Sequence, residues 1–337
     1  MRVHSLIERA LIVGLGSIGK RHVRIVRELF PKINITVLRH NQCDENNMGV
    51  DSCVTTIEDA IARKPQVAII ANPATMHLEV AMQLAKNNIH LLIEKPIAIS
   101  SQGVQELINL CEQKQLVLMT AYNLRFMPSL MELQKQLQKN KIGRIFSIKS
   151  EVGQNLPSWR PDQDYRKSVS AQKKLGGGVL SELSHEIDYI SWIFGPIEWV
   201  KSHISKVSNL EVDVEDNANI ILGFGGELDK EFSATLNMDF IRQDITRMCT
   251  VIGELGTLRW NGVLGTLHLY TEETHKWKLL FSSLTERDYT YKEEFKHFIS
   301  SIESKKTTLI SGTDGLNVIL AIEAIHRSNS TGKIAYI

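Results

Sequence analysis

The chain has 337 residues, 43% of them hydrophobic and 23% charged, with a formal net charge of +1. This length predicts two globular domains, and the near-neutral charge argues against a nucleic-acid binder that relies on overall basicity. No apolar run approaches the roughly 18 residues of a membrane span, and no secretory signal is recognisable, so we expect a cytoplasmic protein without membrane partners.

The four cysteines are scattered along the chain and form no C-x-x-C pair. Such spacing predicts neither a disulfide framework nor a metal site. We therefore expect reduced thiols.

Residues 10–120 alternate short apolar runs with amphipathic ones. The predicted strands are Ala10–Leu15, Ile35–Leu38, Val67–Ala71, Ile89–Ile93 and Leu116–Met119. The predicted helices are Ile18–Leu29, Thr56–Ala62, Met76–Lys86 and Ser101–Gln113. Because the strands are apolar on both faces, helices are expected to cover both sides of a parallel sheet. The pattern predicts an α/β, doubly wound Rossmann domain over residues 1–123.

After Tyr122 the sequence no longer alternates short apolar runs with amphipathic ones. This change predicts a second domain over residues 124–337. The expected elements are a helix at Pro128–Lys139, a strand at Arg144–Glu151, a polar loop at Asn155–Lys174, a helix at Val179–Phe194, alternating runs over 197–281, helices at about 291–303 and 314–328, and a strand at Lys333–Tyr336. In residues 232–238 apolar side chains alternate with small polar ones. This alternation predicts a half-covered, antiparallel sheet and hence an α+β domain.

A glycine-rich motif follows the first predicted strand and opens the first predicted helix. It reads Gly14-Leu15-Gly16-Ser17-Ile18-Gly19. In this context Gly14 suits a tight turn, Gly16 a close approach to a pyrophosphate and Gly19 tight helix packing. Together with Ser17 and Ile18 at the helix start, these glycines predict a dinucleotide site. The alternative is a glycine turn without a ligand.

The second predicted strand ends in Arg39 and His40, where an acidic residue would hold the ribose hydroxyls of NAD. A cation at this place suits the 2′-phosphate of NADP. We therefore expect NADP or NAD as cofactor, with NADP favoured. The alternative is a solvated arginine, with Asp44 or Glu45 reaching the ribose.

The fourth predicted strand ends in Glu94-Lys95-Pro96. Ligands of open α/β sheets lie beyond the carboxyl ends of the strands, so Lys95 is expected near the nicotinamide. There it can donate a proton or hold a substrate oxygen. A turn lysine that points to water is the alternative.

The chain resembles the Gfo/Idh/MocA family, the relatives of glucose–fructose oxidoreductase and inositol dehydrogenase. The resemblance rests on the glycine motif, on residues 72–77, on Glu94-Lys95-Pro96, on residues 122–126, on residues 176–178 with His185 and Asp188, and on residues 312–328. It implies a Rossmann domain joined to a domain with a large, mainly antiparallel open sheet. It also implies a homodimer or homotetramer formed through that sheet.

The same resemblance assigns roles to individual residues. It makes Lys95 and His185 catalytic, and it places Asn72, Pro73 and His77 on the nicotinamide side, with Glu94 in the cofactor site. It implies hydride transfer to or from a hydroxyl-bearing carbon of a sugar, nucleotide sugar or cyclitol. We expect Lys95 and His185 to flank the reacting oxygen, one as acid or base and the other as electrostatic stabiliser.

One segment departs from the commonest pattern of this family. Many members have an aspartate four residues before the histidine, where this chain has Ser181. On a continuous helix Ser181, His185 and Asp188 would share one face, with Glu182 three residues before His185. Glu182 or Asp188 is expected to take over the role of the aspartate and to contact substrate. A partly buried structural histidine is the alternative.

The polar loop contains Trp159, Arg160 and Tyr165, which we predict to bind an oxygenated substrate. Arginine suits carboxylate or phosphate, and the aromatic rings can stack on a sugar or base. A solvated loop or a subunit contact is the alternative. Arg125 is a further substrate candidate, whose alternative is an interdomain salt bridge.

Two other functions remain open at this stage. A lyase or glycosidase could use tightly bound NAD in an internal redox cycle, which the departure at Ser181 permits. A non-catalytic dinucleotide-binding protein would keep the glycine motif without needing Lys95 and His185.

Overall fold

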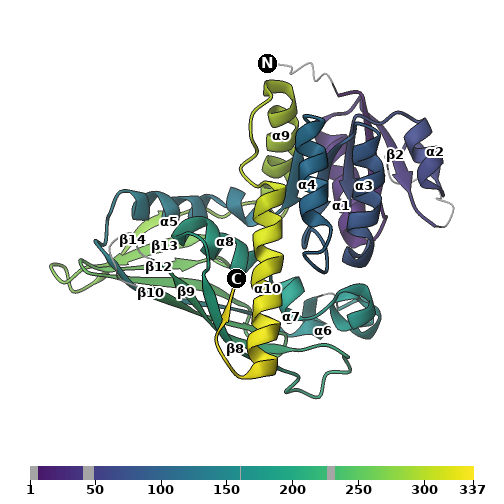
Figure 1. The fold of residues 1–337 in the computed structure, drawn as a ribbon. Helices are drawn as coiled ribbons and strands as arrows, with labels where there is room; N and C mark the ends of the chain where they lie inside the picture. The colour runs from purple at the N-terminus through teal and green to yellow at the C-terminus, as the bar shows by residue number, and fades with distance from the viewer. Residues whose placement is uncertain (1–6, 41–48, 160, 226–231) are drawn as a thin grey trace. The chain divides into compact units, whose positions relative to one another are not determined.

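The computed structural model describes residues 7–40, 49–159, 161–225 and 232–337, and it divides into two compact units (Figure 1). Unit 1 comprises Met1–Asn123 and Arg287–Ile319, and unit 2 comprises Leu124–Glu286 and Leu320–Ile337. The first changeover, after Asn123, coincides with the boundary expected from the sequence. The return of residues 287–319 to unit 1 differs from the contiguous second domain that we expected, because no local pattern marks which unit a helix packs on.

Unit 1 contains a six-stranded parallel sheet in the order β3-β2-β1-β4-β5-β6. Its strands are β1 (Arg9–Val13), β2 (Asn34–Leu38), β3 (Ser52–Val54), β4 (Val67–Ile70), β5 (His90–Glu94) and β6 (Leu118–Ala121). The central strands are buried on both faces, with Leu11 and Ile69 fully inaccessible. The prediction of a doubly wound sheet is thereby confirmed. The sequence missed β3, whose three residues bury only Val54.

The helices of unit 1 form because apolar residues recur at helical spacing and termini are capped locally. They are α1 (Ser17–Leu29), α2 (Ile57–Ala62), α3 (His77–Lys86), α4 (Val104–Gln113), α9 (Tyr289–Ser304), the beginning of α10 (Gly312–Thr331), and the 3₁₀ turn η2 (Ala74–Met76). In α1 the buried side chains include Val23 and Val26, three residues apart. The Thr56 hydroxyl accepts from the amide of Asp59 and caps α2.

Unit 2 is built on a nine-stranded sheet in the order β14-β13-β12-β11-β7-β10-β9-β8-β15. Its strands are β7 (Ile145–Gly153), β8 (Trp199–Ser205), β9 (Asn217–Phe224), β10 (Phe232–Asp239), β11 (Thr246–Gly253), β12 (Thr257–Asn261), β13 (Thr266–Tyr270), β14 (Trp277–Ser282) and β15 (Ala335–Tyr336). Among the described strands of this sheet, only β7 and β10 pair in parallel. The sheet is therefore mainly antiparallel, as the resemblance implied.

One face of this sheet is covered and the other is open. In β10, Leu236 and Met238 are buried while Thr235 and Asn237 are exposed, which confirms the predicted alternation.

The remaining elements of unit 2 are helices and 3₁₀ turns. They are η3 (Asn123–Phe126, whose first residue belongs to unit 1), α5 (Pro128–Gln138), α6 (Leu156–Trp159), η4 (Tyr165–Lys167), η5 (Val169–Ala171), η6 (Lys173–Leu175), α7 (Val179–Glu182), α8 (His185–Phe194) and the end of α10.

Two buried hydrogen bonds join helices of unit 2 to its sheet. The indole of Trp260 on β12 donates to the Ser129 hydroxyl of α5 at 2.9 Å. The hydroxyls of Ser150 on β7 and Tyr189 on α8 lie 2.7 Å apart. Burial without such partners would destabilise the unit, so these bonds set how α5 and α8 rest on the covered face.

The prediction of one helix over residues 179–194 is wrong. α7 ends at Glu182 and α8 begins at His185. The Ser184 hydroxyl donates to the carbonyl of Ser181 at 3.0 Å, a local bond that competes with regular helix. Ser181 and His185 consequently do not share the face of a continuous helix.

The expectation that the thiols are reduced is wrong for one described cysteine. Cys53 is disulfide-bonded, whereas Cys111 and Cys249 are free and buried. Spacing along the chain does not show which thiols meet in space, so the sequence could not exclude a bridge.

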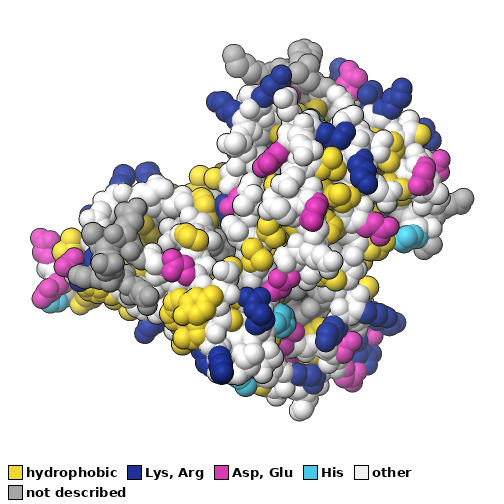
Figure 2. Space-filling view, viewed as in Figure 1, with side chains coloured by type: hydrophobic (Ala, Val, Ile, Leu, Met, Phe, Trp, Pro, Cys, Tyr) yellow, Lys and Arg dark blue, Asp and Glu magenta, His cyan; other side chains and the backbone are white. Residues whose placement is uncertain are grey.

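Two further observations concern the described residues only. None of their helices has the length and apolar character of a membrane span, and no group of three or more His, Cys, Asp and Glu residues is arranged to hold a metal ion. On the face shown in Figure 2, cationic and anionic side chains are interspersed over each unit.

Candidate functional site

The glycine motif lies between the end of β1 and the start of α1. Gly14 has a φ of +88°, and a Cβ on it would lie 2.8 Å from the amide nitrogen of Asn72. A Cβ on Gly19 would lie 2.1 Å from the carbonyl oxygen of Gly14. Both positions therefore admit no side chain. Because the two clashes are with backbone, the loop and helix can pack this closely only with glycine.

Gly16 differs from its neighbours because a Cβ there would meet no described atom within 4 Å. It is the N-cap of α1, has no side-chain cap, and precedes a first turn without acidic residues. Ser17 is exposed and Ile18 is half-buried at this helix start. An uncapped helix start with open space in front of it suits an anionic pyrophosphate. The chain thus fits a dinucleotide at this loop.

Arg39 and His40 follow β2, as predicted. The Arg39 amide donates to the carbonyl of Val54 at 3.1 Å, which ties this position to β3. Arg39 is half-buried and His40 is exposed. The alternative partners of the ribose, Asp44 and Glu45, lie outside the described residues.

His77 connects the two loops expected on the nicotinamide side. Its Nδ1 lies 2.9 Å from the carbonyl oxygen of Pro96, and its Nε2 lies 2.8 Å from that of Asn72. Burial lowers the pKa of His77, although both carbonyl contacts oppose that shift. His77 is 1% exposed, so it fixes the spacing of residues 72–73 and the Lys95–Pro96 turn and presents little surface to a ligand.

The Asn72 side chain has a buried amide oxygen whose hydrogen-bonding capacity is unused by the described residues. Its Oδ1 is buried and has no hydrogen-bond partner among the described residues. Pro73 beside it is half-buried. A buried acceptor without a donor is costly, so a ligand amide is a chemically suitable partner here.

The Glu94-Lys95-Pro96 turn lies at the carboxyl end of β5, and the Lys95–Pro96 bond is cis. Glu94 is 8% exposed and accepts a 2.7 Å hydrogen bond from Nε2 of His22 on α1. Burial would raise the pKa of Glu94, but the hydrogen bond and charge of His22 hold it below its usual value. Lys95 is half-buried beside this carboxylate.

In unit 2, His185 is buried at the first position of α8. Asp188, one turn later, accepts two hydrogen bonds from Arg125, from Nε at 3.0 Å and from Nη2 at 2.7 Å. Arg125 is 3% exposed, and its guanidinium also lies 5.4 Å from the ring of Trp192. Arg125 therefore forms a salt bridge, as the alternative interpretation supposed. Both partners lie within unit 2, so the bridge does not join two domains.

Glu182 lies at the end of α7 and accepts from the hydroxyl of Ser170 at 3.0 Å. The start of α7 is held by Glu215, whose carboxylate accepts from the amide of Leu180 at 3.3 Å. Burial raises the pKa of Glu215. Sequence reasoning missed Glu215 because nothing near it in the chain marks its contact with α7.

The predicted substrate loop is tied to the rest of unit 2. The Trp159 indole donates to the carbonyl of Gln154 at 3.2 Å, and its ring lies edge-on to Phe240. The hydroxyl of Tyr165 accepts from the amide of Glu211 at 3.1 Å. Arg160 lies outside the described residues. Trp159 and Tyr165 remain predicted substrate residues, but both already have partners within the protein.

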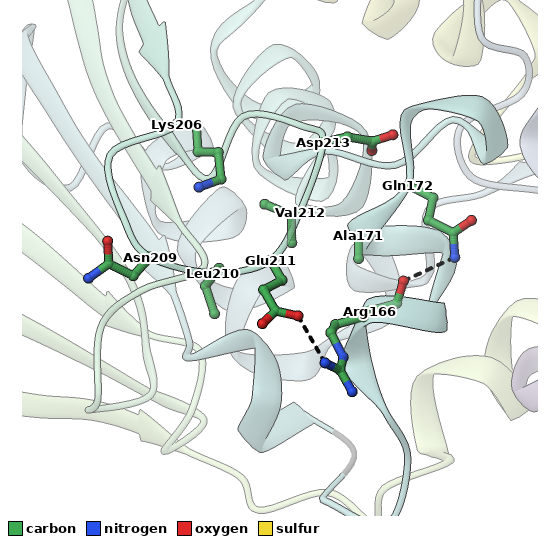
Figure 3. A pocket seen from close by; sticks show the side chains of 9 residues that line it. All are labelled: Arg166, Ala171, Gln172, Lys206, Asn209, Leu210, Glu211, Val212 and Asp213. Atoms are coloured by element: carbon green, nitrogen blue, oxygen red, sulfur yellow. Dashed lines mark hydrogen bonds and ion pairs between the residues drawn. The ribbon is translucent and has the colours of Figure 1, made fainter.

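An open pocket of about 620 Å³ is lined in part by this loop (Figure 3). Arg166 reaches across its rim to Glu211 at 2.9 Å, and Gln172 donates to the carbonyl of Arg166 at 3.1 Å. Lys206 and Asp213 line it further. The pocket lining includes neither Trp159 nor Tyr165, so stacking on those rings would have to occur elsewhere.

His22 is the residue at this site that sequence reasoning missed in unit 1. It lies three positions after Gly19, in the buried stripe of α1 with Val23 and Val26. A histidine in an otherwise apolar helix stripe was a usable signal, since such a side chain needs a buried partner.

Comparison with known proteins matches the chain to one family. Residues 8–122 match the Gfo/Idh/MocA model described as an oxidoreductase family with an NAD-binding Rossmann fold. Residues 134–337 match the model of the same family's C-terminal alpha/beta domain.

Curated relatives are similar over different lengths. Myo-inositol 2-dehydrogenase of Thermotoga maritima is 24% identical over 94% of this chain and 95% of its own. 2,7-anhydro-N-acetylneuraminate hydratase of Escherichia coli is 25% identical over 78% of this chain and 68% of its own. An uncharacterised oxidoreductase of Synechocystis is 29% identical over 48% of this chain. The match spans only 43% of that relative's length.

Solved structures share the fold. Levoglucosan dehydrogenase in complex with NADH has a TM-score of 0.85 at 20% identity, with 98% of both chains covered. The WlbA dehydrogenase from Bordetella pertussis, solved with NADH and UDP-GlcNAcA, has a TM-score of 0.81 at 20% identity and the same coverage. Because the two domain models match in order and the second alone covers more than half of the sequence, the chain belongs to the Gfo/Idh/MocA oxidoreductase family.

Proposed function

We propose that this protein is an NAD(P)-dependent dehydrogenase or reductase that acts on a hydroxyl-bearing carbon of a sugar, nucleotide sugar or cyclitol. The observation that carries the proposal is the uncapped start of α1, where Gly16 faces open space and Gly14 and Gly19 pack against backbone. A nicotinamide bound through this loop supplies the hydride chemistry. Relatives named as dehydrogenases of myo-inositol and levoglucosan support the substrate class.

The cofactor is proposed to be NADP or NAD, with NADP favoured by Arg39 at the end of β2. The structural neighbours named above were solved with NADH, which makes NAD the competing choice. A paired thermal-shift titration decides between them, because a ligand that binds only the folded state raises the melting temperature with concentration. A protein that responds to neither dinucleotide refutes the proposal.

Lys95 and His185 are proposed as the groups that manage the proton released when an alcohol becomes a ketone. Positioned acid–base groups contribute about 10²- to 10⁴-fold to rate. Lys95→Met should therefore lower kcat by at least about 100-fold on the preferred substrate while dinucleotide binding persists. Undiminished turnover in Lys95→Met refutes this assignment, and His185→Asn tests the second residue separately.

Because of the family departure at Ser181, Glu182 or Asp188 is the candidate for the role of the missing aspartate. Asp188 is engaged by Arg125 and Glu182 by Ser170. We propose that these carboxylates support His185 and Arg125 in a substrate-binding region that also contains Trp159, Arg160 and Tyr165. A substrate panel with single substitutions, read as separate changes in KM and kcat, tests each contact.

A second function is favoured by one relative, the 2,7-anhydro-N-acetylneuraminate hydratase. In an internal redox cycle, tightly held NAD is reduced and reoxidised within one turnover. A dehydrogenase changes NAD(P)H absorbance stoichiometrically with product, whereas such a cycle forms product without a net change. The absorbance trace recorded beside product analysis distinguishes the two.

We also propose a cytoplasmic homodimer or homotetramer that associates through the open sheet face. This face carries exposed apolar side chains, with Ile221 at 40%, Trp277 at 39% and Leu279 at 51% exposure. Exposed apolar patches favour association. Light scattering coupled to size exclusion measures the assembly, and a monomer at all concentrations refutes it.

A further inference from the structure

We propose that His22 is a positioning residue for the reaction: it holds the Glu94 carboxylate in place beside Lys95 and so ties the dinucleotide-binding helix to the catalytic turn. The inference rests on the proposed function in taking Lys95 as catalytic. It concerns residues within unit 1 alone, on α1 and at the end of β5.

The carboxylate of Glu94 bonds in two directions. Its Oε1 accepts from Nε2 of His22 at 2.7 Å, and its Oε2 accepts from the backbone amide of Lys95 at 3.2 Å. His22 is 1% exposed and Glu94 is 8% exposed. In such a water-poor setting a charge-assisted bond is short and strong, so a displacement of α1 is transmitted to the backbone at Lys95.

The other contacts of His22 show that its polar function is directed at Glu94. The second ring nitrogen, Nδ1, has no hydrogen-bond partner among the described residues. The ring of Tyr291 on α9 packs edge-on at 5.9 Å between centroids. A histidine retained only for packing would be replaceable by an apolar side chain, whereas this one contributes its single described hydrogen bond to the carboxylate of the turn.

The charge state of Glu94 depends on this contact. The titratable groups that face it are His22 on α1, His77 on α3, Lys95 in the same turn and Tyr291 on α9. Burial raises the pKa of Glu94, and the bond and charge of His22 lead the opposing effects that keep it low. Loss of the His22 donor therefore raises this pKa, and the carboxylate becomes protonated at a higher pH.

The test compares two substitutions of equal polarity. The amide nitrogen of Gln occupies nearly the position of histidine Nε2, whereas that of Asn corresponds to Nδ1 and falls short of Glu94. In His22→Asn we expect kcat to fall about 10- to 100-fold with little change in KM, since small misplacements of catalytic groups cost this much. His22→Gln should recover a large part of that loss.

The pH dependence provides the readout that a purely structural role would not move. In His22→Asn the acid limb of the kcat profile should shift to higher pH, because Glu94 loses the donor that keeps its pKa low. Glu94 with a depressed pKa contributes stability that is present above its unfolded pKa and lost as pH falls through its folded pKa. In His22→Asn this loss should begin at a higher pH, whereas His203→Gln, at an exposed histidine of β8, should leave the pH of onset unchanged.

Several outcomes overturn the inference. Equal kcat values in His22→Asn and His22→Gln, or an unmoved acid limb, exclude a directed contact. If His22→Asn does not fold, Glu94→Gln replaces it and should lower kcat similarly. Unchanged kcat in Glu94→Gln refutes the proposal. The stability measurement needs no substrate or dinucleotide, so it tests the His22–Glu94 pair even where undiminished turnover in Lys95→Met has refuted the catalytic role of Lys95, or where a missing response to both dinucleotides has refuted the proposed function.

Discussion

The buried ion pair of Arg125 and Asp188 offers the sharpest single test of how unit 2 holds its candidate catalytic helix. Asp188 lies on α8 one turn after His185, and Arg125 belongs to η3. We choose Arg125→Met, which keeps most of the side-chain volume and removes the charge. The substitution also decides whether Arg125 acts on substrate or on the protein.

The expected magnitude follows from burial and geometry. Both partners are almost inaccessible, at 3% and 0% of side-chain area, and the contact is bidentate. Removing the bidentate partner of a buried charge is strongly destabilising and costs about 3–5 kcal/mol. Replacing both, as in Arg125→Met with Asp188→Leu, should cost less than the sum of the two single changes because no buried charge remains.

Equilibrium urea unfolding of the four proteins of this double-mutant cycle provides the measurement. With a typical m of about 1–3 kcal/mol/M, the Arg125→Met midpoint should fall by at least about 1 M. The matched control is Lys135→Met on α5. Its pair with Glu132 is 3.4 Å long and solvent-exposed at Lys135, so its loss should cost no more than about 0.5 kcal/mol.

An Arg125→Met protein as stable as the Lys135→Met control would refute this reasoning. So would single changes whose free energies add without coupling. If stability is unchanged but KM for the substrate rises, Arg125 acts on substrate, as the sequence predicted. A large loss of stability with unchanged KM assigns it to the support of α8.

Further predictions concern the dinucleotide loop, the cofactor and one buried acid. Gly16→Val should fold normally, because no described atom contacts a Cβ there, yet raise the dinucleotide Kd at least about tenfold by occupying the pyrophosphate position; thermal-shift titration measures both. Gly19→Ala should instead lower the melting temperature itself, since its Cβ would meet the Gly14 carbonyl at 2.1 Å. Arg39→Ala should weaken NADP at least about tenfold and spare NAD, by loss of a charge-assisted phosphate contact; equal effects on both would contradict the role. Burial raises the pKa of Glu215, so ionisation of this carboxyl group opposes folding as pH rises. The Glu215→Gln variant should be as stable as the wild type below the usual pKa of glutamate and at least as stable at pH 7. A variant that is less stable than the wild type at pH 7 contradicts this expectation.

Local chemistry accounts for the parts of the fold that the sequence predicted. The strands of unit 1 are continuous apolar runs because both faces are buried, and β10 alternates because one face is open. The glycine motif was readable for a similar reason: Gly14 adopts a positive φ, and a Cβ on Gly19 would meet the carbonyl of Gly14 in the same loop. Periodicity and local sterics are properties of neighbouring residues, so one sequence suffices to show them.

Tertiary structure alone decided which distant groups meet. The pairs His22 with Glu94 and Arg125 with Asp188 join residues 72 and 63 positions apart. The end of one predicted helix at Glu182 and the return of residues 287–319 to unit 1 likewise depend on the whole fold. A buried polar group must find a partner, but any partner that the topology brings within hydrogen-bond reach will satisfy it. The residue types therefore predicted that buried polar contacts would exist, but only the folded chain determined which residues form them.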